Sequence, residues 1–176
     1  MHYKKNTHNK DKFRTKKRKS DTKSLKKNYK LSEHFSRKDF YCKSGLDKNN
    51  SNFRISAGLV GALELIRSIA NTRINIIKGF ECSESAEKKG KVARNFHVQG
   101  LAANITADDL SLNELAKIAN SVPEISGICL NLDQGYVHIR TNKSEEKKLW
   151  VIKDTTEIDI NESNIKTFFY EAIKPN

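Results

Sequence analysis

The sequence predicts an α+β domain whose central sheet is mainly antiparallel. Apolar residues recur at helical spacing in two segments, 56–71 and 111–121, and short β-branched runs follow each of them. The runs 127–132 and 136–142 are separated by Asp133-Gln134-Gly135, which is typical of a hairpin turn. The resulting order of helix, strand, strand, helix and hairpin has no internal repeat, and it favours helices packed on one sheet.

The first half of the predicted domain contains a short helix, a long helix and a strand. Ser36 is placed to cap a short helix that ends at Phe40. The long helix predicted at 56–71 has one apolar face, which carries Leu59, Leu63, Ile66 and Ala70. The β-branched run at 74–77 predicts a buried strand.

The second half begins with a polar, irregular stretch at 81–96, for which we expect an exposed loop. A strand is expected at 101–106. Ser111 and Glu114 have the spacing of a capping box, which predicts a helix that continues to about residue 121. After the hairpin, residues 149–152 favour one more strand.

The C-terminal residues predict a helix with one apolar face, formed by Ile165, Phe168, Phe169, Ala172 and Ile173. We expect this face to pack on the domain, and binding of a partner is the alternative. The chain therefore divides into a tail at 1–30, a folded domain at 31–154 and a helical extension at 155–176.

Basic residues are concentrated in the tail. The chain has 33 Lys and Arg against 21 Asp and Glu, a formal net charge of +12, and residues 1–30 carry all but one of these net charges. Few apolar residues lie there, so we expect disorder. Such a tail binds polyanions in a salt-dependent way or serves only to solubilise the chain. The expected polyanion contacts are Lys16, Lys17, Arg18, Lys19, Lys26 and Lys27.

Composition excludes several classes of protein. No apolar run is long enough to span a membrane, and no apolar segment follows the basic N-terminus as it does in a secretory signal. We therefore expect a cytoplasmic location, or the cell envelope if the true start lies upstream. Cys42, Cys82 and Cys129 are odd in number and lack CxxC spacing, which favours reduced thiols over a disulfide framework. The sequence does not predict an oligomeric state.

Two of the five histidines belong to a candidate site. His97 precedes one predicted strand, and His138 lies inside another. Because side chains alternate along a strand, Tyr136, His138 and Arg140 share one face, and small residues flank Asn104 on its own strand. We therefore expect His97, Asn104 and His138 to converge. Two separate structural histidines are the alternative.

The segment His97-x-x-Gly100-x-Ala102-x-Asn104 resembles the His-x-x-Gly-x-Ala-x-Asp signature of the zinc D-alanyl-D-alanine carboxypeptidases. Other segments resemble further parts of that family in the same order, namely Leu31 to Phe35, Asp39 to Cys42, Ile76 to Cys82 and Val137 to Arg140. The resemblance spans about 31–150. It implies the hedgehog/DD-peptidase fold, shared with lysostaphin-type peptidases, and a zinc ion that activates water against a peptide carbonyl.

The same resemblance implies that His97, Asn104 and His138 are the zinc ligands. However, Asn104 stands where the family has an Asp, and a neutral amide oxygen is a poorer zinc ligand than a carboxylate. Zinc is therefore expected to bind weakly, as a degenerate triad. No residue is assigned as catalytic, because no base motif precedes His138.

The substrate-cleft positions implied by the family also depart from its pattern. Glu81 stands at the position of an Arg that contacts an anionic group, and Arg140 stands at that of an Asp. Lys78 and Asn95 each replace a Ser. We expect these four residues to line the cleft. One hypothesis is that Glu81 and Arg140 form a salt bridge of reversed sense, and independent drift at two positions is the alternative.

Three functions remain open. The first is a pseudoenzyme that binds a peptidoglycan peptide or a protein in the former catalytic cleft. The second is a weakly active zinc peptidase on peptidoglycan peptides, with a substitute carboxylate from Glu81, Glu84 or Glu87. The third is a polyanion-binding protein that works through its basic tail. Zinc content separates the first two, and salt dependence identifies the third.

Overall fold

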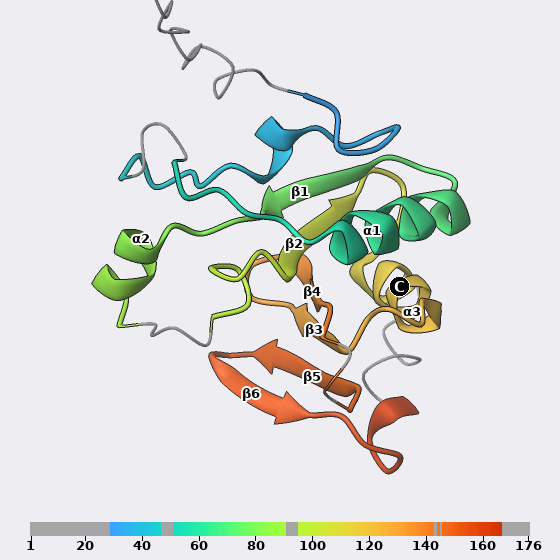
Figure 1. The fold of residues 1–176 in the computed structure, drawn as a ribbon. Helices are drawn as coiled ribbons and strands as arrows, with labels where there is room; N and C mark the ends of the chain where they lie inside the picture. Colours follow the sequence, from blue (N-terminus) through green and yellow to red (C-terminus); the bar gives the residue numbers. More distant parts are fainter. Residues whose placement is uncertain (1–28, 47–50, 91–94, 143, 145, 167–176) are drawn as a thin grey trace, which may run out of the picture.

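The computed structural model describes residues 29–46, 51–90, 95–142, 144 and 146–166. The described chain folds around one six-stranded sheet (Figure 1). The elements, in chain order, are the 3-10 helix η2 (Arg37–Phe40), α1 (Ala57–Ala70), β1 (Ile74–Lys78), α2 (Ser83–Lys88), β2 (Ala102–Ala107), α3 (Leu112–Ser121), β3 (Gly127–Asn131), β4 (Tyr136–Arg140), β5 (Lys148–Lys153) and β6 (Thr156–Asp159).

The sheet has the strand order β1-β2-β4-β3-β5-β6. All neighbouring strands are antiparallel except β3 and β5, which run parallel. The prediction of a mixed α+β fold with a mainly antiparallel sheet is therefore confirmed. The hairpin of β3 and β4 also lies where the turn residues placed it.

Local signals in the sequence set the helix ends. The Ser56 hydroxyl accepts a hydrogen bond from the Gly58 N–H at 3.2 Å and caps α1, which ends where Asn71 adopts the left-handed conformation at φ 49°. Ser111 and Glu114 form the predicted capping box of α3. The helices predicted from Ser36, 56–71 and 111–121 are therefore confirmed.

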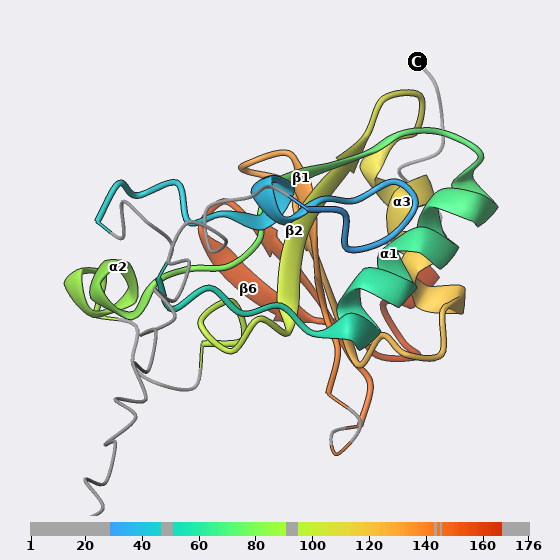
Figure 2. The same ribbon diagram turned by 45° about the horizontal axis from the view of Figure 1, so that its top comes forward.

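The two longer helices cover one face of the sheet. Figure 2 shows α1 and α3 on the same side of the strands. Inward side chains of the strands pack with both helices in a single apolar core, which includes Leu63, Ile105, Leu115 and Ile139. The opposite face of the central strands is left for polar and aromatic side chains, because neighbours along a strand point to opposite faces.

The structure corrects three predictions and leaves two outside its range. The strand predicted as buried at 74–77 is β1, which lies at the edge of the sheet, and only its first residue, Ile74, is buried. The stretch 81–96 is not simply an exposed loop, because it contains α2 and a nearly fully buried Glu81. Strand β6 was not predicted, and it pairs with β5 at the start of the expected helical extension. The basic tail up to residue 28, with all six predicted polyanion contacts, lies outside the described residues. So does the apolar face of the C-terminal helix beyond Ile165.

Candidate functional site

A cleft of about 410 Å³ lies on the sheet face opposite α1 and α3. Strand register places a row of side chains across its floor. Asn104 of β2 pairs with His138 of β4, His138 pairs with Cys129 of β3, and Cys129 pairs with Trp150 of β5. Lys78 at the end of β1 lies opposite Asn104 and continues the row. Five strands therefore contribute one side chain each to this row across the cleft.

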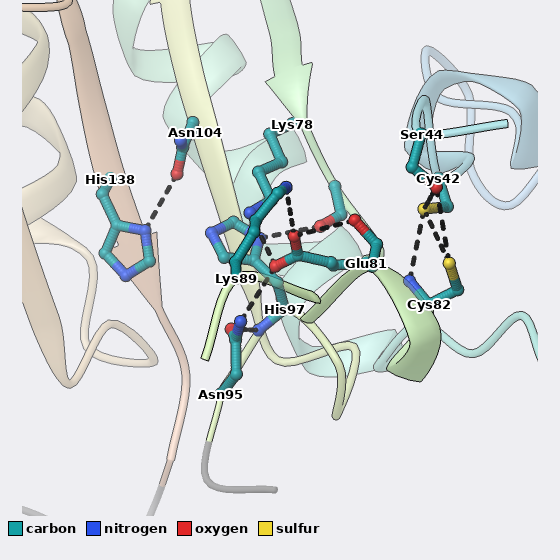
Figure 3. Close-up of polar contacts among 12 residues, drawn as sticks. Cys42, Ser44, Lys78, Glu81, Cys82, Lys89, Asn95, His97, Asn104 and His138 are labelled. Carbon is teal, nitrogen blue, oxygen red and sulfur yellow. Dashed lines mark hydrogen bonds and ion pairs between the residues drawn. The ribbon is translucent and has the colours of Figure 1, made fainter. Parts of the chain in front are cut away.

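His97 enters the cleft from the loop that precedes β2. Its Nδ1 lies 2.7 Å from the backbone oxygen of Gly79 (Figure 3). A carbonyl oxygen only accepts, so Nδ1–H donates and Nε2 keeps its lone pair. Burial, reinforced by the nearby Lys78 charge, lowers the pKa of His97 to about 4, and its imidazole is neutral at pH 7.

His138 and Asn104 form a direct pair beside His97. The Nδ1 of His138 lies 2.9 Å from Oδ1 of Asn104, so the ring donates to the amide oxygen. The rings of His97 and His138 meet edge to face, with centroids 5.1 Å apart. The three side chains that the sequence predicted to converge do lie together, and both imidazoles reach the cleft.

This donor set does not complete a zinc site. Catalytic zinc sites use three protein ligands, and here the third ligand would be a neutral amide whose oxygen already accepts from His138. Among the residues that the structure describes, no three His, Cys, Asp or Glu side chains are grouped so as to hold a metal ion. Cys129 lies in the row, but burial raises the pKa of its thiol to about 12. A thiolate ligand is therefore disfavoured at neutral pH.

Glu81 is buried just behind the cleft and is 1 % exposed. Its carboxylate forms ion pairs of 2.7 Å with both Lys78 and Lys89 and accepts a hydrogen bond from Asn95 at 2.9 Å. Burial disfavours its ionised form, but these hydrogen bonds and the Lys78 charge outweigh burial and lower the pKa of Glu81 to about 2.

The Glu81 network positions the loop that carries His97. The amide oxygen of Asn95 accepts from the His97 backbone N–H at 2.9 Å, while the amide nitrogen of Asn95 donates to Glu81. The Glu81 backbone N–H also donates to the His97 carbonyl at 3.2 Å. Glu81 therefore holds both Lys78 and the His97 loop without itself lining the cleft.

Arg140 is placed on the cleft wall between two aromatic rings. Its guanidinium lies 4.6 Å from the ring centroid of Phe96 and 5.4 Å from that of Trp150. The opposite residue on β3 is Gly127, where an added Cβ would collide with the Arg140 side chain. This glycine leaves the space through which the arginine reaches the rings.

The hypothesis of a Glu81–Arg140 salt bridge is wrong. Glu81 pairs instead with Lys78 and Lys89, and Arg140 packs on aromatic rings. Of the four expected cleft residues, Lys78, Asn95 and Arg140 line the cleft. The proposed substitute carboxylates of Glu81, Glu84 and Glu87 do not, since no Asp or Glu is found among its described lining residues.

Sequence reasoning missed the aromatic and thiol parts of the cleft. Phe96, Cys129, Trp150 and Ile152 line it but were not singled out. The signal for Cys129 and Trp150 was alternation along their strands, which points both toward the face of His138. Phe96 is the last residue of the polar stretch 81–96, for which a loop is expected, and alternation gives no information there.

No described helix is long and apolar enough to cross a membrane.

Comparison with family models finds a match to Peptidase M15 over residues 28–140, which is more than half of the chain. This match includes His97, Asn104 and His138 and ends at the last residue of β4. No curated protein matches the chain.

Proposed function

Because the chain belongs to the peptidase M15 family, we propose that it binds an acidic peptide in the family's cleft without hydrolysing it. The M15 family consists of zinc peptidases, so a peptidase-like role follows from membership. The finer proposal, a pseudoenzyme whose ligand is a peptidoglycan-type peptide with a free carboxylate, rests on the cleft itself.

The observation that carries the proposal is the charge of the cleft lining. Its described residues include Lys78 and Arg140 but no Asp or Glu. A hydrolytic site of this family needs a metal ligand carboxylate and a general base, whereas the residue between the two histidines is Asn104. Two cationic side chains, with no acidic one among the described lining residues, favour an anionic ligand.

Arg140 is the residue best placed to select that ligand. Stacking on Phe96 and Trp150 fixes the plane of its guanidinium, which has the fork geometry that matches a carboxylate. Lys78 reaches the same cleft, although its ammonium is partly neutralised by Glu81. We therefore expect the ligand carboxylate to lie at Arg140, with the peptide chain across the His138 side of the sheet.

The test is a fluorescence titration of the full chain, because Trp150 is its only tryptophan and lies 5.8 Å from His138. The probe is a short peptide that ends in D-Ala-D-Ala with a free C-terminal carboxylate. The same peptide with an amidated C-terminus is the control ligand. We expect saturable quenching by the acid and at least about 10-fold weaker binding of the amide. Arg140→Gln should weaken binding of the acid peptide by the same factor of at least about 10. Lys153→Gln removes one exposed charge outside the cleft and should leave that affinity unchanged.

Zinc content and peptide cleavage decide between binding and catalysis. We expect the purified chain to hold no stoichiometric zinc and to release no D-alanine, while Asn104→Asp gains zinc affinity. Stoichiometric zinc in the parent chain, lost in His97→Ala/His138→Ala and accompanied by product release, would overturn the proposal in favour of a weakly active peptidase. Equal affinity for the acid and the amide would overturn the carboxylate assignment.

The role proposed for the basic tail needs a separate comparison. If the tail drives binding of a polyanion, deleting residues 1–30 abolishes that binding and leaves cleft titrations intact. Binding through the tail also weakens steeply with added salt. A polyanion titration that is flat between low and high salt would refute a function of this kind.

A further inference from the structure

Two of the three cysteines lie against each other away from the cleft floor. Sγ of Cys42 is 3.2 Å from Sγ of Cys82, and the Cys82 backbone N–H donates to Cys42 Sγ at 3.3 Å (Figure 3). Neither cysteine takes part in a disulfide in the structure. Ser44 also contacts Cys42, with its Oγ 3.1 Å from that sulfur. The contact joins the described N-terminal segment, residues 29–46, to the turn before α2, forty residues later in the chain.

Backbone contacts hold the two cysteines next to each other. Two residues before each cysteine, the Phe80 N–H donates to the Phe40 carbonyl at 2.8 Å. Both phenylalanines are buried, and Gly79 packs so closely that an added Cβ would lie 2.6 Å from the Phe40 Cα. The two segments are therefore fixed to each other by main-chain contacts, which keep the two cysteines side by side.

We propose that Cys42 and Cys82 form a disulfide site that fastens the N-terminal segment to the turn carrying Glu81. The sulfur atoms must approach from 3.2 Å to the bond length of about 2.05 Å, a shift that side-chain rotation can supply. In the reaction, the two thiols lose two protons and two electrons as the S–S bond forms. A disulfide oxidant such as oxidised glutathione takes them up, and its own S–S bond breaks to give two thiols.

The two cysteines have different roles in that exchange. Cys42 is partly exposed and Cys82 is buried, so the oxidant reaches Cys42 first and Cys82 resolves the mixed disulfide. Burial raises the pKa of Cys42, but hydrogen bonds with Cys82 and Ser44 outweigh it, and the net pKa is lowered. Cys129 is buried, with a pKa raised to about 12, and is therefore the unreactive internal control.

The bond would act on the cleft through its neighbour in sequence. Cys82 directly follows Glu81, whose carboxylate holds Lys78 and, through Asn95, the His97 loop. Oxidation closes a loop that contains α1 and β1, which restricts the unfolded chain and anchors the turn at Glu81. This inference does not depend on what the cleft binds.

The experiment counts thiols in the full chain after incubation with oxidised or reduced glutathione. We expect the number of thiols in denaturant to fall from three to one, with a mass loss of two hydrogen atoms and a peptide map that joins Cys42 to Cys82. The melting temperature of the oxidised chain should rise by about 5 °C or more. The variant Cys129→Ser should behave as the parent does and fall from two thiols to none.

Single-cysteine variants complete the test. Cys42→Ser replaces the partly exposed member, so it should fold, retain two thiols and lose the redox dependence of its melting temperature. Cys82→Ser should do the same, and if it does not fold, Cys42→Ser and the parent peptide map still decide. Three thiols that persist in oxidised glutathione, a bond to Cys129, or a bond between two chains would each overturn the proposal.

Discussion

Removing the charge of Glu81 tests how the buried ion-pair network stabilises the fold. The variant Glu81→Gln keeps the size of the side chain and leaves Lys78 and Lys89 without their shared carboxylate. These lysines are 30 % and 53 % exposed, so water can solvate them in the variant. The main loss in the variant is therefore the stabilisation of the folded state that the ionised Glu81 carboxylate provides.

The magnitude follows from the pKa of Glu81. Its pKa falls from 4.5 to about 2 on folding, and each pKa unit corresponds to about 1.4 kcal/mol, so ionised Glu81 contributes on the order of 3 kcal/mol. A lowered carboxyl pKa stabilises the folded state fully above pH 4.5. The contribution disappears as the pH falls from 4.5 to about 2, because the unfolded chain takes up its proton first.

Urea unfolding of the parent chain and the variant at several pH values measures this contribution. At pH 7 we expect the midpoint of Glu81→Gln to lie about 1–2 M urea lower, for a slope of about 2 kcal/mol per M. The difference between the two midpoints should shrink as the pH falls below 4.5 and vanish only near pH 2. The control Glu87→Gln, an exposed change on α2, should move the midpoint by less than about 0.3 M. A difference between parent and Glu81→Gln that is constant from pH 7 to pH 3 would refute the reasoning.

Three further predictions concern His97 and two glycines. Folding lowers the pKa of His97 from 6.5 to about 4, so the free energy of unfolding should decrease as the pH falls from 6.5 to 4. His97→Asn keeps a donor for the Gly79 carbonyl but does not titrate, so the urea midpoint of this variant should depend less on pH in that range. Gly79→Ala places a Cβ against the backbone of η2 and should cost about 2 kcal/mol or more by thermal unfolding, whereas Gly61→Ala has open space and should not destabilise α1. Gly127→Ala should displace Arg140 and weaken binding of the carboxylate peptide in the Trp150 titration, with little change in melting temperature; unchanged binding would contradict the assigned wall.

Much of the fold could be predicted because its signals are local. Ser56 and the Ser111–Glu114 pair each cap a helix through contacts within three residues, and the hairpin turn lies between its own strands. Strand β6 escaped prediction because its residues are mostly exposed and carry no apolar alternation. The parallel pairing of β3 and β5 could not be predicted either, since register between distant strands depends on tertiary packing.

The candidate site was predictable where strand alternation applied and unpredictable where loops decide the geometry. Alternation grouped Tyr136, His138 and Arg140 on one face of their strand, and all three line the cleft. The register of β2 and β4 then places Asn104 opposite His138. Glu81 lies in a polar stretch whose composition indicates exposure, yet two lysines and Asn95 make its burial tolerable. Only the folded chain shows that these partners reach it from three different positions.

The cleft joins a shared part of the chain to a part that lies beyond the family match. His97, His138 and Asn104 lie within residues 28–140, whereas Trp150 and Ile152, which also line the cleft, come from β5. Substitutions in β5 can therefore reshape what the cleft accepts without touching the histidine pair. A chain cut after β4 would keep that pair but leave the backbone hydrogen-bonding groups of β3 open to a second molecule. The strand that supplies Trp150 and Ile152 to the cleft therefore also protects the sheet from self-association.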